Sequence, residues 1–315
     1  MKRTYRAVAY TMQGLVKYHG LRDWDLRLPY HDSISVNTTC LRTEASVTDA
    51  AGGGVFIEGR PSESANRRLQ GVVSRLSPGA KVGDFRIDSR NVPSRKVKGV
   101  GYSSSAGAAL TLLCASMLGS GKEDLTSLST SARLFAASAA RSLVGGFSRL
   151  YAGASDENTY AEKFADSKDM DLRMVIVPLP SRAKTEDAHR EVTTSPFFAA
   201  RVESAQRRCD EMERAITGND LKALGTLAER DTMELHAVTM TGEGRMVLMT
   251  GDTLRVIGRV RALRQDGVEA YFSMQTGPSV FVNTSERDQP KVMRALQKLG
   301  YRCYVSGVGG PAELV

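Results

Sequence analysis

Residues 91–113 read NVPSRKVKGVGYSSSAGAALTLL, a loop rich in glycine, serine and lysine that runs directly into a helical pattern. The loop glycines allow backbone to approach a ligand closely. The serines at 103–105 place hydroxyls where the first N–H groups of a helix have no partner. This arrangement favours a phosphate site at the helix start, and the alternative is an ordinary serine cap on a flexible loop. The helical spacing is carried by Ala106, Ala109, Leu110 and Leu113.

The overall composition is that of a protein with a folded core. The chain has 315 residues, 41% hydrophobic and 25% charged, which suggests two domains or one large one. No apolar run is long enough to span a bilayer, and Met1-Lys2-Arg3 is not followed by an apolar signal segment. We therefore expect a cytoplasmic protein. Four scattered cysteines without a CxxC pair predict neither a disulfide framework nor a metal site.

The net charge of +8 indicates an anionic binding partner. A basic protein can bind nucleic acid, but it can equally bind a small, multiply charged anion. Lysines and arginines are spread along the chain, and aromatic residues make up only 6% of it, with no aromatic-basic stripe. We expect a small anionic ligand, and neither nucleic acid nor a membrane as partner.

A second motif lies near the N-terminus, where residues 10–39 read YTMQGLVKYHGLRDWDLRLPYHDSISVNTT. Its core VKYHG resembles the Ile/Val-Lys-Tyr-Trp-Gly-Lys signature of mevalonate-pathway decarboxylases. Arg-Asp, Leu-Pro and Ser-x-Ser-Val elements follow in the family's order. His19 replaces the family's Trp, and Leu21 replaces its second Lys. That Lys helps hold the terminal phosphates in relatives that use a diphosphate, so its loss favours a 5-monophosphate substrate.

The resemblance implies a catalytic role for Lys17 and substrate contacts for Tyr18 and His19. Without the family, Lys17 would be read as an exposed charge near a strand end. Tyr18 and His19 could then simply be packed side chains, because a lone histidine is more often structural than catalytic.

The opening stretch resembles the phosphate loop of the GHMP kinase superfamily, which has a Pro, a short gap and then Gly-Leu-Gly-Ser-Ser-Ala-Ala. Here Pro93 is followed by a longer gap. The resemblance implies phosphate or nucleotide contacts from Gly101, Ser103, Ser104, Ser105, Ala106 and Gly107.

A third motif, SARLFAASAARSLVGGF at residues 131–147, is a helical segment of small residues that ends at a pair of glycines. Arginine is rarely buried without a partner, and its planar fork suits a carboxylate or phosphate. The segment resembles the decarboxylase motif Gly-Ser-Gly-Ser-Ala-x-Arg-Ser-Leu-x-Gly-Gly-Phe. This implies that Arg141 holds the substrate carboxylate and that Ser138 and Ser142 contact the substrate. A structural ion pair is the alternative role for Arg141.

In the second half, residues 193–198 read TTSPFF and resemble the family's Thr-Ser-Pro-Phe/Tyr element beside the substrate. The resemblance implies that Ser195 contacts the substrate, and the alternative is a helix N-cap followed by Pro. Two helices are expected after it, the second capped by Asn219.

The segment AYFSMQTGPSVFVN at residues 270–283 resembles the family's strand, glycine loop and strand, in which an Asp is the catalytic carboxylate. Gln275 stands at that catalytic position. A neutral amide can hydrogen-bond but cannot act as a base. The residue is either native to a reaction that needs no base or a lesion in one that does.

With a Val-Gly-Gly-Pro tail at 308–311, five motifs cover the whole chain in the family's order. The resemblance implies an α/β (α+β) two-domain GHMP fold. Residues 1–170 would form a half like domain 2 of ribosomal protein S5, carrying the phosphate loop. Residues 171–315 would form a ferredoxin-like half, with the active site between the two. Homodimers are common in the family, so a homodimer is possible.

Three functions follow from these observations. The leading one is an ATP-independent mevalonate 3,5-bisphosphate decarboxylase that needs no cofactor and makes isopentenyl phosphate. The alternative is an ATP- and Mg-dependent decarboxylase of phosphomevalonate or diphosphomevalonate, or a mevalonate 3-kinase relative. A non-catalytic or RNA-binding protein on the same fold is the third, and the presence of Lys17, Tyr18 and Arg141 argues against it.

Overall fold

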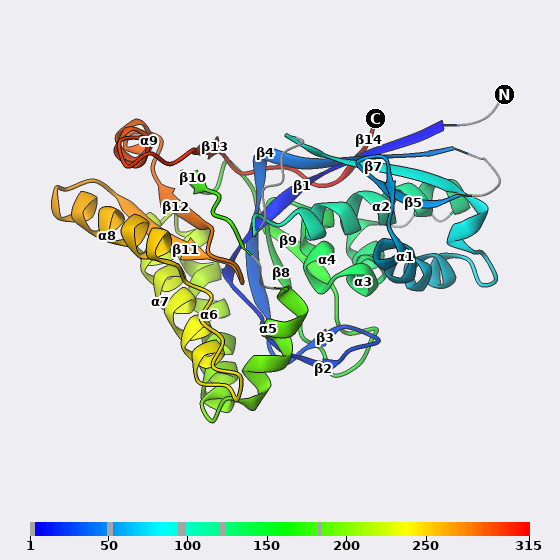
Figure 1. Cartoon of the computed structure of the whole chain (residues 1–315), viewed down its shortest axis with the longest axis horizontal. Helices are drawn as coiled ribbons and strands as arrows, with labels where there is room; N and C mark the ends of the chain where they lie inside the picture. Colours follow the sequence, from blue (N-terminus) through cyan, green and yellow to red (C-terminus); the bar gives the residue numbers. More distant parts are fainter. Residues whose placement is uncertain (1–3, 49–52, 94–98, 120–123, 182–183) are drawn as a thin grey trace.

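The computed structural model describes residues 4–48, 53–93, 99–119, 124–181 and 184–315. Two main sheets organise them (Figure 1), together with a short hairpin of β2 (Leu21–Asp23) and β3 (Leu28–Pro29). Within the described ranges, the larger sheet runs in the order β14 (Glu313–Leu314), β1 (Thr4–Val16), β4 (Ser33–Thr48), β7 (Arg86–Val92), β5 (Gly54–Ile57) and β6 (Arg60–Pro61), with β8 (Phe147–Leu150) on β4 and β9 (Ala161–Ala165) on β8.

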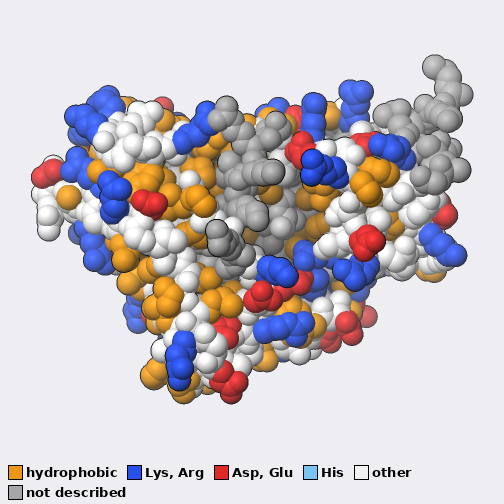
Figure 2. Space-filling view, viewed as in Figure 1, with side chains coloured by type: hydrophobic (Ala, Val, Ile, Leu, Met, Phe, Trp, Pro, Cys, Tyr) orange, Lys and Arg blue, Asp and Glu red, His pale blue; other side chains and the backbone are white. Residues whose placement is uncertain are grey.

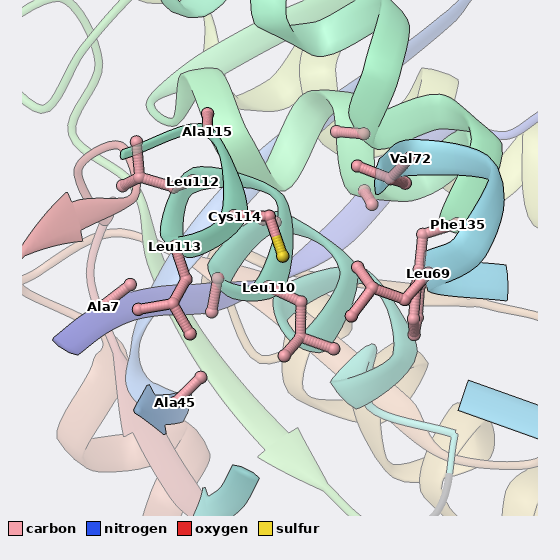
Figure 3. Close-up of a cluster of buried hydrophobic side chains, with 14 of the residues drawn as sticks. Ala7, Ala45, Leu69, Val72, Leu110, Leu112, Leu113, Cys114, Ala115 and Phe135 are labelled. Atoms are coloured by element: carbon pink, nitrogen blue, oxygen red, sulfur yellow. The ribbon is translucent and has the colours of Figure 1, made fainter. Parts of the chain in front are cut away.

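Four helices pack against the larger sheet. They are α1 (Glu63–Leu76), α2 (Tyr102–Leu118), α3 (Leu125–Phe135) and α4 (Ala137–Val144). Figure 3 shows their core, in which Leu110 and Leu113 of the almost wholly buried α2 gather with small side chains of β1 and β4. This burial is the main stabilisation of the N-terminal half, since removing apolar surface from water is the dominant favourable term in folding.

Side chains of the smaller sheet point alternately toward two layers of helices. Its order is β11 (Ala270–Met274), β12 (Val280–Thr284), β10 (Arg173–Val177) and β13 (Tyr304–Ser306). Met174 and Ile176 face a core shared with α6 (Phe198–Thr217) and α7 (Leu221–Met240). Val175 and Val177 face the core shared with α8 (Gly251–Gln265) and α9 (Gln289–Gln297). This is the two-residue period of a strand buried on both faces.

Strands β1 and β4 connect the two halves. They run through the middle of the molecule between helices α1–α4 and α6–α8 (Figure 1). Their first and last portions contribute to different cores, because Ala7 lies in the α2 cluster whereas Leu15 and Val16 lie in the α6 cluster. The tail of the chain returns to this sheet, where β14 pairs with β1 and residue 308 bridges Thr38.

Two local expectations differ from the structure. The predicted helix at 131–147 is two helices, α3 and α4, separated by Ala136 in an extended conformation (φ −161°, ψ 133°). The second C-terminal helix is capped by Asp220 rather than Asn219. The Asp220 side chain accepts the Ala223 N–H, whereas Asn219 adopts a left-handed conformation with φ 52° before it. In the part of the chain that is described, no helix is both long and apolar enough to cross a membrane.

The contact between α7 and β11 yields a stability prediction. A Cβ on Gly225 would lie 2.0 Å from Tyr271 Cγ, so Gly225→Ala forces the ring or the helix to move. We expect a loss of about 1–3 kcal/mol in the free energy of unfolding. Gly258→Ala, in α8 with open space around it, is the control and should gain up to about 1 kcal/mol from helix propensity alone. Urea unfolding measures both, and equal effects would contradict the close packing.

Candidate functional site

A cavity of about 620 Å³ lies between the two halves and contains the three predicted catalytic positions, Lys17, Arg141 and Gln275. They come from the end of β1, from α4 and from the turn between β11 and β12. Other described lining residues come from both halves and include Met12, Tyr18, Leu21, Arg27, Arg68, Gly99, Gly101, Ser103, Ser104, Ser138, Lys184, Glu186, His189 and Thr276.

The start of α2 faces this cavity. Gly101 is the N-cap of the helix, with a left-handed φ of 91°, and a Cβ there would lie 2.9 Å from the carbonyl oxygen of Met12. Glycine is therefore required by both conformation and space. Ser104 Oγ donates to Ser138 Oγ at 2.7 Å, which links α2 to α4. Residues 94–98 of the predicted loop lie outside the described residues.

Three predicted loop contacts serve packing instead, and Ser105, Ala106 and Gly107 do not line the cavity. Ser105 Oγ lies 2.7 Å from Thr43 Oγ1 and also donates to a backbone carbonyl. Ala106 packs against the N-terminal core. A Cβ on Gly107 would lie 2.6 Å from Ala139 Cβ, so glycine there lets α2 approach α4. Ser105, Ala106 and Gly107 come after the exposed start of α2, where the helix enters the interior of the protein.

Arg141 is a buried cation without a protein partner. It is 0% exposed, and none of its three guanidinium nitrogens has a hydrogen-bond partner in the described part of the chain. Its guanidinium carbon lies 5.5 Å from the centre of the Tyr18 ring. Burial lowers the pKa of Arg141 to about 10, so the group stays charged at neutral pH. A buried charge of this kind is unfavourable until an anion binds. No ion pair with a residue that the structure describes accounts for its burial.

Lys17 and His19 share one hydroxyl. Lys17 Nζ donates to Thr276 Oγ1 at 3.1 Å, and His19 Nε2 lies 3.1 Å from the same oxygen. Burial, followed by the Arg141 guanidinium, lowers the pKa of Lys17 well below its ordinary value, against the opposing Asp231 carboxylate. Thr276 lines the cavity, whereas His19, which is bonded to it, does not. It is therefore placed to orient the hydroxyl rather than to contact a ligand.

Of the remaining predicted substrate contacts, the structure brings two to the cavity. Tyr18 and Ser138 line it, and the Tyr18 ring is stacked on His189 with 5.2 Å between centroids. Ser142 lies elsewhere, because its hydroxyl donates to the Tyr10 carbonyl and fastens α4 to β1. Ser195 also lies elsewhere.

Ser195 is engaged within the C-terminal half. Its Oγ lies 2.7 Å from Thr241 Oγ1 and accepts the Phe197 N–H. It is not the N-cap of α6 either, since that position belongs to Phe197. The Ser-Pro element thus shapes the turn that leads into α6.

The side chain of Gln275 makes a hydrogen bond that requires an amide N–H. Its Nε2 donates to the backbone carbonyl of Met12 at 2.8 Å, and the side chain is 7% exposed. A carboxylate in this orientation would direct an oxygen at another oxygen. The surroundings therefore suit glutamine, which favours a native amide over a lesion.

Positive charge dominates the cavity. Its described lining includes five basic side chains and a single carboxylate, Glu186, which lies 2.6 Å from Arg68 Nη2 and 3.5 Å from Arg27 Nη2. Elsewhere, lysines and arginines are scattered among acidic residues rather than gathered in one stripe, as Figure 2 shows for one face. This distribution suits a small polyanion. In the described ranges, no group of three His, Cys, Asp or Glu side chains could hold a metal ion.

Comparison with known proteins agrees with this geometry. The model of the diphosphomevalonate decarboxylase-like N-terminal domain matches residues 9–161, and that of the mevalonate 5-diphosphate decarboxylase C-terminal domain matches residues 181–303. The chain is 40% identical to the phosphomevalonate decarboxylase of Haloferax volcanii, over 100% of this chain and 98% of that protein. The chain belongs to the mevalonate-pathway decarboxylase family. It is therefore an enzyme of the carboxy-lyase class, as the sequence predicted, and not a non-catalytic protein on the same fold.

More distant members of the family have the same fold. The mevalonate 3,5-bisphosphate decarboxylase of Thermoplasma acidophilum is 25% identical over 89% of this chain and 70% of that protein. The mevalonate diphosphate decarboxylase structure from Staphylococcus aureus has a TM-score of 0.90 at 25% identity, over 100% of this chain and 98% of that one. The Enterococcus faecalis enzyme has a TM-score of 0.91 at 24% identity, over 100% and 99%. The predicted GHMP-type fold is confirmed.

The sequence interpretation missed the carboxylate that positions Lys17. Asp231 of α7 is 2% exposed and accepts the backbone N–H of Lys17 at 3.0 Å. It also accepts from Arg201 Nη2 at 2.7 Å and from Arg208 Nη1 at 3.0 Å, and Arg201 in turn donates to the Lys17 carbonyl. One signal was available, because the two arginines are seven residues apart and so lie on the buried face of their helix.

Proposed function

We propose that this enzyme converts 5-phosphomevalonate to isopentenyl phosphate, using ATP to phosphorylate the 3-hydroxyl before decarboxylation. The observation that carries the proposal is the presence of two anion sites in one cavity. The unpartnered Arg141 suits a carboxylate, and the start of α2 suits a phosphate chain. A second anion site is what a nucleotide-using decarboxylase requires. The 40% identity to a phosphomevalonate decarboxylase supports the same substrate.

The residues at the start of α2 fit a nucleotide phosphate. Gly99 and Gly101 have left-handed φ angles of 75° and 91°, and Ser103 and Ser104 line the same cavity with Lys184. These groups would hold the phosphates of ATP, which supplies the phosphoryl group. Glu186 is the single carboxylate among the described lining residues. A magnesium ion would therefore be held largely by the nucleotide's own phosphates and by water.

A monophosphate suits the substrate end of the cavity. Leu21 lines it where diphosphate-using relatives carry a lysine, so one cation for a second phosphate is missing. Arg27 and Arg68 line the same cavity and are available for a single phosphate, although Glu186 contacts both of them. We propose that the 5-phosphate competes with Glu186 for these two arginines.

The decarboxylation step depends on electrostatics. When the 3-phosphate departs, C3 becomes electron-poor, and the electron pair of the C1–C2 bond forms the new double bond as CO₂ leaves. Arg141 holds the carboxylate in the orientation that this requires, and Lys17 lies near enough to stabilise charge on the departing phosphate. The phosphoryl-transfer step is itself governed mainly by positioning, so Gln275 does not forbid it.

A second candidate is the ATP-independent decarboxylation of mevalonate 3,5-bisphosphate. The observation that favours it is the amide at position 275 and its hydrogen bond to the Met12 carbonyl. A substrate that arrives already phosphorylated at O3 presents no proton to remove, so the missing carboxylate would have no consequence.

One assay separates the two candidates. Purified enzyme is given 5-phosphomevalonate with and without ATP-Mg, and separately mevalonate 3,5-bisphosphate without ATP, and CO₂ and isopentenyl phosphate are measured. We expect ATP-dependent turnover of 5-phosphomevalonate. Turnover of the bisphosphate alone, with none in the ATP mixture, would replace the first candidate by the second. Absence of product in every mixture would reject both.

A further inference from the structure

The proposed phosphorylation requires a proton acceptor for the 3-hydroxyl, and the described residues that line the cavity include no free carboxylate. Gln275 occupies the family's acidic position. Glu186 is 44% exposed in its side chain and is bound by Arg68 at 2.6 Å. Asp231 does not line the cavity and is held by two arginines. The base must be a group of another kind.

The hydrogen bonds around Lys17 can all be made by a neutral amine. Its Nζ donates one hydrogen to Thr276 Oγ1 at 3.1 Å. The hydroxyl hydrogen of Thr276 can then be given to His19 Nε2, also at 3.1 Å, if that ring nitrogen is unprotonated. Burial lowers the pKa of His19 well below its ordinary value, which provides this acceptor. These two hydrogen bonds leave the lone pair of the Lys17 nitrogen free to face the cavity, which Lys17 lines.

The charges that face Lys17 favour the same state. From α4, the Arg141 guanidinium opposes a second cation, and from α6, Arg201 binds the Lys17 carbonyl. His189 of α5 (Thr185–Glu191) and His236 of α7 are neutral at pH 7, with pKa values lowered to about 3 and about 4, mainly by burial. Among the described groups, Asp231 of α7 is the opposing anion, and its charge is shared with Arg201 and Arg208.

We infer that the Lys17 amine is the general base of the phosphorylation step, in place of the carboxylate missing at position 275. The inference depends on the proposed function. The proton of the 3-hydroxyl moves to Nζ as the bond from O3 to the γ-phosphorus forms and the bond from that phosphorus to ADP breaks. The resulting ammonium then lies beside the new 3-phosphate. When the C3–O3 and C1–C2 bonds break, the phosphate leaves with this proton and CO₂ is released, so one lysine serves both steps.

The first test compares Lys17→Arg with Lys17→Met. Arginine keeps a cation but cannot accept a proton, so ADP formation from ATP and 5-phosphomevalonate should fall by about 100-fold or more. Release of CO₂ from mevalonate 3,5-bisphosphate needs no base, and the arginine cation can stabilise the departing phosphate, so this activity should fall much less in Lys17→Arg than in Lys17→Met. Equal losses of both activities in Lys17→Arg would overturn the inference.

The pH profile is the second test. ADP formation by the unmodified enzyme should decrease as the pH falls through the lowered pKa of Lys17, because protonation removes the base. Gln275→Glu adds an anion to the cavity that Lys17 lines and raises the pKa of the amine, so this decrease should begin at a higher pH. If residue 275 itself became the base, the decrease would move to a lower pH and the inference would fail.

A direct titration completes the design. In protein with ¹³C-labelled lysine, one Cε signal, absent from Lys17→Arg, should titrate well below the ordinary lysine range. Titration near pH 10.5 would overturn the inference. If the unmodified enzyme forms no ADP from 5-phosphomevalonate, the proposed function fails and the base role fails with it. ADP formation at the unmodified rate by Lys17→Arg rejects the base role alone.

Discussion

Replacing Arg141 by methionine is expected to reduce decarboxylation by about 1,000-fold or more, because the carboxylate loses the group that orients it and balances its charge. The same substitution should not lower the melting temperature. The guanidinium is 0% exposed and has no hydrogen-bond partner among the described residues, so its removal takes away an uncompensated buried charge. Replacing a buried ion by an apolar side chain of similar volume is commonly neutral or stabilising.

Arg133 provides the matched control. It is also 0% exposed and lies in the preceding helix, but its guanidinium donates to the Thr159 carbonyl at 3.0 Å and pairs with Asp156. Arg133→Met should therefore destabilise the protein while the folded fraction keeps its activity. Kinetics and thermal unfolding of both variants test this contrast. A fall in melting temperature for Arg141→Met, with activity retained, would assign Arg141 a structural role.

Replacing Asp231 by alanine is expected to lower the free energy of unfolding by about 3–5 kcal/mol, because Arg201 and Arg208 lose their buried carboxylate and keep only the partly exposed Glu234. The substitution also releases the backbone N–H of Lys17, so turnover should decrease in the fraction that folds. Urea unfolding followed by circular dichroism measures the first effect and CO₂ release the second.

Glu234→Ala is the control on the same helix. Its carboxylate pairs with Arg208, Arg230 and, at 3.5 Å, Arg201, but it is 29% exposed and both buried arginines keep Asp231, so we expect about 1 kcal/mol or less. A similar loss from both substitutions would show that water reaches the Asp231 cluster. The difference in unfolding free energy between the two variants therefore measures how well water is excluded from the Asp231 cluster that positions Lys17.

The motifs predicted the main members of the cavity. Lys17, Arg141 and Gln275 are each more than 100 residues apart in sequence, and the family resemblance alone brought them together. The resemblance did not separate serines that differ only in orientation. Ser138 and Ser142 are one helical turn apart in α4, yet the first bonds to Ser104 in the cavity and the second to a backbone carbonyl of β1.

Other features depend on contacts that no local pattern contains. Asp231 looked like an ordinary helical carboxylate, because its partners lie on another helix and at the end of β1. The break at Ala136 separates α3 from α4 without a proline or glycine to mark it. In both cases tertiary packing decides the local outcome.

The returning tail has a consequence for protein synthesis. Gly146 N–H binds the Gly309 carbonyl, the Asn37 amide binds the Gly310 carbonyl, and Ala312 N–H binds the Leu143 carbonyl. A nascent chain that has emerged only to residue 303 already contains both family domains but lacks this closing segment. The turn that follows α4, the helix of Arg141, therefore gains its final hydrogen bonds only after residues 309–312 have emerged from the ribosome, long after the helix itself.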